Sequence, residues 1–222
     1  MFVRPTTSRS SATRTSEVLL DDLAALDQKA VKAFYAAGCR YLQLDDTSWG
    51  EFCSAEKRKA YAERGIDVDE VGRQVCLRAR TRSSKQAGDM VITMHICRGN
   101  FRSTWSSTGG YEPVAEILFG HCNVDGFFLE YDSDRAGGFE PLRYIGKQKV
   151  VLGLVTSKDA KLETRKTLSR VSARLPNMCR SSSWRSAAVR LRFHRGRQPC
   201  HRCGSVEQAG ARQGDAEEVW AD

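Results

Sequence analysis

The run "VITMHICRGN" (residues 91–100) ends an apolar segment with a histidine and a cysteine. His95 and Cys97 are two residues apart, so on an extended strand both side chains point to the same side. An imidazole nitrogen and a thiolate sulfur are preferred ligands of Zn²⁺, which binds them in tetrahedral geometry. Glu130 ends another apolar run, "VDGFFLE", and could add a carboxylate oxygen. The three residues are therefore candidate zinc ligands. A substrate thiol would bind at the open position of the zinc, and the zinc would lower the pKa of that thiol.

Each of these residues also has an ordinary structural interpretation. The pattern His-x-Cys is short enough to occur by chance, and a buried cysteine beside a hydrogen-bonded histidine is common in protein cores. Glu130 could instead form an ion pair with Arg98 or Arg135 at the same edge of the fold. The spacing alone leaves both interpretations open.

Helical and extended segments alternate along the chain. The first helix has apolar residues at helical spacing and ends before Gly38, a residue typical of helix ends. Pro113 fits the first turn of a later helix. The expected elements, in order, are helix 17–37, strand 39–46, a helix within 54–64, strand 90–96, a helix from about 113, strands 124–132 and 149–157, and helix 159–170.

The expected strands are continuously apolar, which is typical of a parallel sheet covered by helices. Three of the four end in reactive side chains: Asp45 with Asp46, His95 with Cys97, and Glu130 with Asp132. A (β/α)8 TIM barrel places its catalytic groups at these strand ends. A doubly wound sheet does so too, but no glycine-rich phosphate turn follows a strand here. The predicted fold class is α/β, a partial TIM barrel of about four strands.

Several segments in the same order resemble the C-terminal zinc barrel of cobalamin-independent methionine synthase, and especially its short, single-barrel bacterial relatives. The resemblance covers about residues 17–71 and 89–168, and it is carried by "YLQLDDTSW", "MHICRGNFRSTWSSTGGYEPVAEILF", "VDGFFLEYDSDRAGGFEPLR" and "KVVLGLVTSK".

The resemblance implies roles for four residues. His95 and Cys97 match the family's zinc-binding pair, and Glu130 matches its glutamate ligand. Asp45 matches the aspartate that binds the amino group of homocysteine. The implied reaction is zinc-dependent methyl transfer from 5-methyltetrahydrofolate, or from its polyglutamated form, to the homocysteine thiolate.

The chain departs from this family in two respects. The family's fourth zinc ligand, a cysteine in "SPQCGF", is missing, and the family's first three strands would be expected before residue 17. When codons that could encode the tail are read in a shifted frame, they can give "PQCGF" and neighbouring segments of the family. We therefore interpret residues from about 170 to 215 as a frame-shifted translation. Residues 72–88 show a weaker signal of the same kind. The Cys200–Cys203 CxxC motif is then accidental. We therefore expect weak zinc binding and no turnover.

The net charge of +8 over 222 residues is concentrated in one stretch. Residues 174–212 contain nine arginines and one glutamate, which account for the whole excess. The expected organisation is a disordered leader at 1–16, the partial barrel at 17–170 and an irregular Arg-rich tail at 171–222. Eight cysteines and no signal peptide indicate a cytoplasmic protein, and no apolar run is long enough to span a membrane.

Two alternatives remain from the sequence. One is zinc-dependent alkyl transfer to another thiol such as coenzyme M, against which Asp45 favours an amino-acid thiol. The other is a non-enzymatic basic protein that contacts nucleic acid through its arginines. Aromatic residues do not regularly interleave with those arginines, and the shifted reading frames explain the arginines without selection, so nucleic acid is an unfavoured partner.

Overall fold

Four parallel strands form one open sheet in the computed structural model, which describes residues 16–80, 89–156 and 158. The strands are β1 (Tyr41–Asp46), β2 (Val91–Ile96), β3 (Gly126–Glu130) and β4 (Lys149–Gly153), and they lie side by side in chain order. The α/β class and all four predicted strands are thus confirmed. The register aligns Asp45 of β1 with His95 of β2, and His95 with Phe128 of β3.

Within the described residues, one α-helix precedes the first strand, and four α-helices and two short 3₁₀ helices connect the strands. They are α1 (Ser16–Ala36), α2 (Ser48–Phe52), α3 (Ala55–Ala62), α4 (Val68–Arg80), α5 (Glu112–His121), η1 (Asp134–Ala136) and η2 (Glu140–Tyr144). Three of the four predicted helices correspond to α1, α3 and α5. Helices α2 and α4 were not predicted, and α4 includes part of the 72–88 segment.

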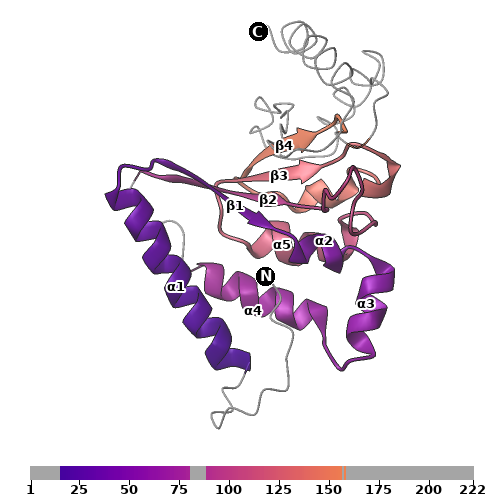
Figure 1. Cartoon of the computed structure of the whole chain (residues 1–222), viewed down its shortest axis with the longest axis horizontal. Coiled ribbons are helices and arrows are strands. Elements are labelled where there is room, and N and C mark those ends of the chain that lie inside the picture. Colours follow the sequence, from indigo (N-terminus) through magenta and orange to yellow (C-terminus); the bar gives the residue numbers. More distant parts are fainter. Residues whose placement is uncertain (1–15, 81–88, 157, 159–222) are drawn as a thin grey trace, which may run out of the picture.

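The helices pack against one face of the sheet (Figure 1). Because side chains alternate along a strand, every second residue points to this face. Met94 and Ile96 of β2, Phe127 and Leu129 of β3, and Leu152 of β4 are buried there in one cluster. Residues from α2, α4, α5 and η2 complete that cluster, and α1 packs separately on the starts of β1 and β2 through Val31.

The opposite face of the sheet carries the polar side chains of the strands. The alternation that buries Met94 and Ile96 turns Thr93 and His95 the other way, together with Asp45 and Glu130 from the neighbouring strands. The Thr93 hydroxyl donates a hydrogen bond to the Tyr41 hydroxyl across this face. The reactive groups therefore share one face as well as one end of the sheet.

Some predicted segments lie outside the described residues. These are the leader up to residue 15, helix 159–170 and the Arg-rich tail 171–222. No helix among the described segments is long and apolar enough to cross a membrane.

Candidate metal centre

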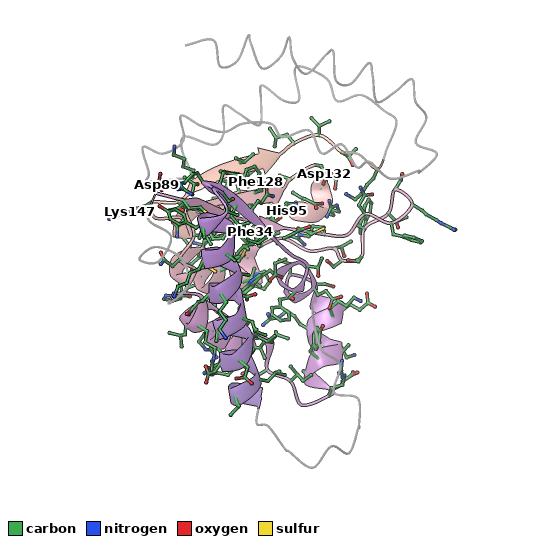
Figure 2. All side chains as sticks on the ribbon, turned by 60° about the vertical axis from the view of Figure 1, so that its left-hand side comes forward. Phe34, Asp89, His95, Phe128, Asp132 and Lys147 are labelled. Atoms are coloured by element: carbon green, nitrogen blue, oxygen red, sulfur yellow. The ribbon has the colours of Figure 1, made fainter. Side chains whose placement is uncertain are left out.

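The predicted site residues meet at the carboxyl ends of the strands. Figure 2 shows Asp89 and Lys147, which precede β2 and β4, at one end of the sheet, and His95 and Asp132 towards the other. Asp45, His95 and Cys97 each offer a ligand atom, and these atoms lie within 4.8 Å of one another. Residues about 50 positions apart in the chain are therefore brought into one cluster.

His95 is buried between two carboxylates. Its Nδ1 lies 2.5 Å from Oδ1 of Asp45, and its Nε2 lies 3.6 Å from Oε1 of Glu130. The Asp45 contact fixes the imidazole ring, as a carboxylate commonly does for a histidine that binds a metal. Because the Asp45 side chain is 55% exposed, a ligand arriving from solvent can also reach it.

Cys97 is held by its backbone at the end of β2. Its N–H donates to the Asp46 carbonyl at 2.8 Å, and the N–H of Gly99 approaches its sulfur at 3.4 Å. Gly50 of α2 packs against the Cys97 carbonyl so closely that a Cβ at position 50 would lie 2.4 Å from that oxygen. Only glycine fits there without displacing either α2 or Cys97.

Glu130 lies at the same strand end but has other partners. Its Oε1 accepts a hydrogen bond from the Arg98 N–H at 3.1 Å, and its Oε2 accepts one from Arg135 Nη2 at 2.8 Å. Burial opposes ionisation of Glu130, but its contact with His95 and the charge of Lys158 outweigh burial and hold its pKa well below the usual range. Glu130 is an anion here, as a carboxyl group must be to bind a metal.

Arg98 and Tyr111 support the site from the core side. The Arg98 guanidinium is fully buried, lies 4.3 Å from the Tyr111 ring centre and donates to the Gly109 carbonyl at 2.8 Å. The Tyr111 hydroxyl accepts a hydrogen bond from the Glu130 N–H at 3.0 Å. These contacts fix the backbone on both sides of the candidate ligands.

The donor set fits zinc. Nitrogen, sulfur and carboxylate oxygen are all zinc ligands, and ligand atoms around a tetrahedral zinc lie roughly 3.5 Å apart. The 3.6 Å between His95 Nε2 and Glu130 Oε1 matches this spacing. The Cys97 sulfur lies within 4.8 Å of a ligand atom of His95. Asp45 Oδ1 lies only 2.5 Å from His95 Nδ1, which is too short for two ligands of one zinc, so Asp45 supports His95 from beside the metal position.

No further cysteine joins this cluster within the described part of the chain. Cys39 precedes β1 and donates to the Tyr41 carbonyl, and Cys76 donates to the Ile117 carbonyl. Burial raises the pKa of the Cys53 thiol to about 11, although Arg98 acts in the opposite direction. Cys53 is therefore protonated at neutral pH.

Sequence reasoning missed several residues that shape the site. It named Arg98 and Arg135 only as alternative partners of Glu130, and the structure shows both contacts, Arg98 through its backbone N–H. It did not anticipate that Asp45 contacts His95, or that Lys158 lies 3.5 Å from Glu130. Local patterns carry no signal for either contact, because both join different strand ends.

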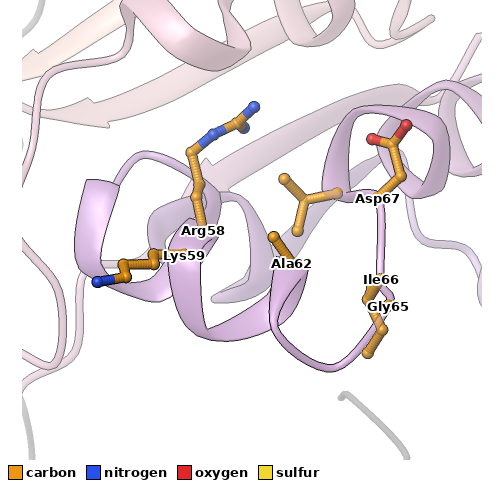
Figure 3. Close-up of a pocket in the computed structure, with 7 residues that line it drawn as sticks. Arg58, Lys59, Ala62, Gly65, Ile66 and Asp67 are labelled. Carbon is orange, nitrogen blue, oxygen red and sulfur yellow. The ribbon is translucent and has the colours of Figure 1, made fainter.

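A hollow of about 550 Å³ lies elsewhere, beside α3 and the start of α4 (Figure 3). It is lined by Arg58, Lys59, Ala62, Gly65, Ile66, Asp67 and Val68, and none of the four candidate site residues contributes to it. Arg58 is already paired with Asp69 at 2.7 Å. The chemistry-bearing side chains therefore lie apart from this hollow.

The fold and cluster define an α/β protein with a candidate metal centre at the ends of a parallel sheet. The chain is similar to two proteins of Bacillus subtilis (strain 168), both named only as uncharacterized proteins. It is 46% identical to YxjH over 156 residues, which cover 69% of this chain and 41% of YxjH. It is 43% identical to YxjG over 165 residues, which cover 73% of this chain and 44% of YxjG. The chain thus spans less than half the length of these relatives.

No protein-family model and no solved structure matches the chain.

Proposed function

We propose that this chain carries the zinc site of a methyltransferase of methionine biosynthesis. The observation that supports the proposal most directly is the convergence of Asp45, His95 and Cys97, with ligand atoms within 4.8 Å of one another. Their position at the carboxyl ends of parallel strands is where barrel enzymes carry out chemistry. The sheet would then be part of a (β/α)8 barrel.

Different residues would bind the metal and the substrate in such a reaction. His95, Cys97 and Glu130 would hold the metal, and bound zinc would supply the charge that lowers the pKa of a substrate thiol. Asp45 would accept the ammonium group of homocysteine, since its carboxylate is exposed beside the cluster. The methyl donor would be 5-methyltetrahydrofolate. A reducing compartment such as the cytoplasm suits a site that depends on a free cysteine.

The resemblance to methionine synthase supports this choice over alkyl transfer to coenzyme M. Coenzyme M has no amino group, so a transferase acting on it would not need an exposed carboxylate beside the metal. Asp45 occupies that position.

The chain as it stands is expected to be a poor catalyst. A thiolate ligand contributes both affinity and negative charge at zinc, and the family's second cysteine is missing from this sequence. The test is methionine formation from methylated folate and homocysteine with added Zn²⁺, for this chain and for a restored chain. In the restored chain the reading frames of about 170–215 are corrected and the family's first three strands precede residue 17. We expect methionine from the restored chain alone. A restored chain without activity would contradict the proposed function, and equal activity of both chains would contradict the broken site.

A further inference from the structure

Glu130 and three other charged side chains form a buried cluster. Only 5% of the Arg135 side chain is exposed, 6% of Asp132 and of Lys158, and 15% of Glu130. Arg135 Nη2 lies 2.8 Å from Oε2 of Glu130 and 2.6 Å from Oδ1 of Asp132. Lys158 Nζ lies 3.5 Å from the same Glu130 oxygen and 3.8 Å from Oδ2 of Asp132. Two cations are thus shared by two carboxylates.

This arrangement is costly for a purely structural role. Removing each ion from water costs several kcal/mol, and apolar residues of similar size often replace a buried ion pair with no loss of stability. Arg135 also keeps its Nε and Nη1 buried without hydrogen-bond partners. Both carboxylates are instead bound through the single Nη2 atom. The cluster is therefore arranged around the position of its carboxylates.

The two oxygens of Glu130 have different surroundings. Both cations bind Oε2, whereas Oε1 faces His95 Nε2 at 3.6 Å and accepts the Arg98 N–H. That 3.6 Å is close to the roughly 3.4 Å between a nitrogen and an oxygen ligand of tetrahedral zinc. With Oε2 held from behind, Glu130 presents one oxygen to a metal and cannot rotate away.

We propose that Arg135 and Lys158 are positioning residues that fix Glu130 as a one-oxygen metal ligand, with Asp132 balancing their charge. The proposal rests on the metal site of the proposed function, but it is independent of methyl transfer. Hydrogen-bond partners of metal ligands typically change metal affinity by about 10- to 100-fold when they are removed. Arg135 is the stronger partner here, because its contact with Glu130 is the shorter one.

The test is the zinc affinity of the full chain, measured by competition with a chromophoric chelator. Arg135→Gln should weaken zinc binding by about 10- to 100-fold, Lys158→Gln should weaken it less, and Arg135→Lys should retain part of the affinity. Arg143→Gln is the matched control, because Arg143 pairs with Glu112 and both side chains are about half exposed. Its affinity should equal that of the unmodified chain.

A double-mutant cycle separates positioning from general stability. In a Glu130→Gln background, Arg135→Gln should cause no further loss of zinc affinity, because the carboxylate it positions is already gone. Three results would overturn the proposal without contradicting the metal site. They are an equal loss of zinc affinity in both backgrounds, unchanged zinc affinity of Arg135→Gln, and a higher zinc affinity of Arg135→Gln. An unmodified chain that does not bind zinc would overturn the metal site together with this proposal. If Arg135→Gln does not fold, the same cycle with Lys158→Gln decides the question.

Discussion

At the scale of single residues, the candidate site consists of groups whose partners come from other strands. The spacing of His95 and Cys97 is visible in the sequence, because both the strand and its period of two are local features. The contact between Asp45 and His95 depends on the register of β1 against β2. No pattern within either segment encodes that register, so Asp45 was assigned only a substrate-binding role.

The buried Tyr111 gives a prediction on alkaline stability. Burial raises the pKa of Tyr111 to about 12, although Arg98 acts in the opposite direction. Because the folded pKa lies above the unfolded value of about 10, this group's contribution is complete below pH 10 and is lost as the pH rises towards 12. About 2–3 kcal/mol should disappear over that range, which urea unfolding at a series of pH values would measure.

Tyr111→Phe is the control for this effect. The variant loses the hydrogen bond to the Glu130 N–H, so it should be less stable at pH 8 by about 1 kcal/mol. Its stability should then fall less steeply than that of the unmodified chain between pH 10 and 12. Identical slopes for the two proteins would show that Tyr111 is not the group responsible.

At the scale of elements, sequence patterns predicted the helices and strands that are long or have a regular apolar pattern. Helix α1 has apolar residues at helical spacing, and the four strands are continuous apolar runs. Helix α2 has only five residues, too few for a periodic signal. Helix α4 contains Gly72 in its interior, which argues against a helix, yet a Cβ at that position would lie 2.9 Å from the Trp49 ring. The close approach of Trp49 therefore explains why a glycine stands inside this helix, which helix propensity alone does not explain.

Helix α2 should control the position of Cys97 through Gly50. A Cβ at this position would lie 2.4 Å from the Cys97 carbonyl oxygen, so Gly50→Ala must displace α2 or the end of β2. We expect a loss of stability of about 1–3 kcal/mol and weaker zinc binding. Gly120→Ala, at an α5 glycine with no atom within 4 Å of its added Cβ, is the matched control. Equal stability and zinc affinity of the two variants would contradict the proposed role of Gly50.

At the scale of the whole molecule, the exposed apolar residues are concentrated at one side. Five large hydrophobic residues of α1 are substantially exposed, namely Val18, Leu19, Leu23, Leu26 and Phe34. Helix α1 packs through Val31 on the starts of β1 and β2, and β1 forms one edge of the sheet within the described residues. An apolar surface beside an edge strand favours association between chains.

This surface predicts self-association of the purified chain. The apparent mass in light scattering should rise with protein concentration. A Leu26→Lys, Phe34→Lys double variant should show a smaller rise, because both side chains are more than half exposed on α1. Phe101→Lys changes an exposed aromatic residue away from α1 and should leave association unchanged. A constant monomer mass for the unmodified chain would contradict the prediction.

The central claim is that His95, Cys97 and Glu130 form one metal site with Asp45 beside it, and zinc binding by the full chain tests this claim most directly. Equilibrium dialysis should find a bound zinc that His95→Gln or Cys97→Ser weakens at least tenfold. A Cys200→Ser, Cys203→Ser variant, which removes the CxxC motif of the Arg-rich tail, should bind zinc like the unmodified chain. Loss of zinc on changing Cys200 and Cys203, with binding retained after changing His95 or Cys97, would contradict the account.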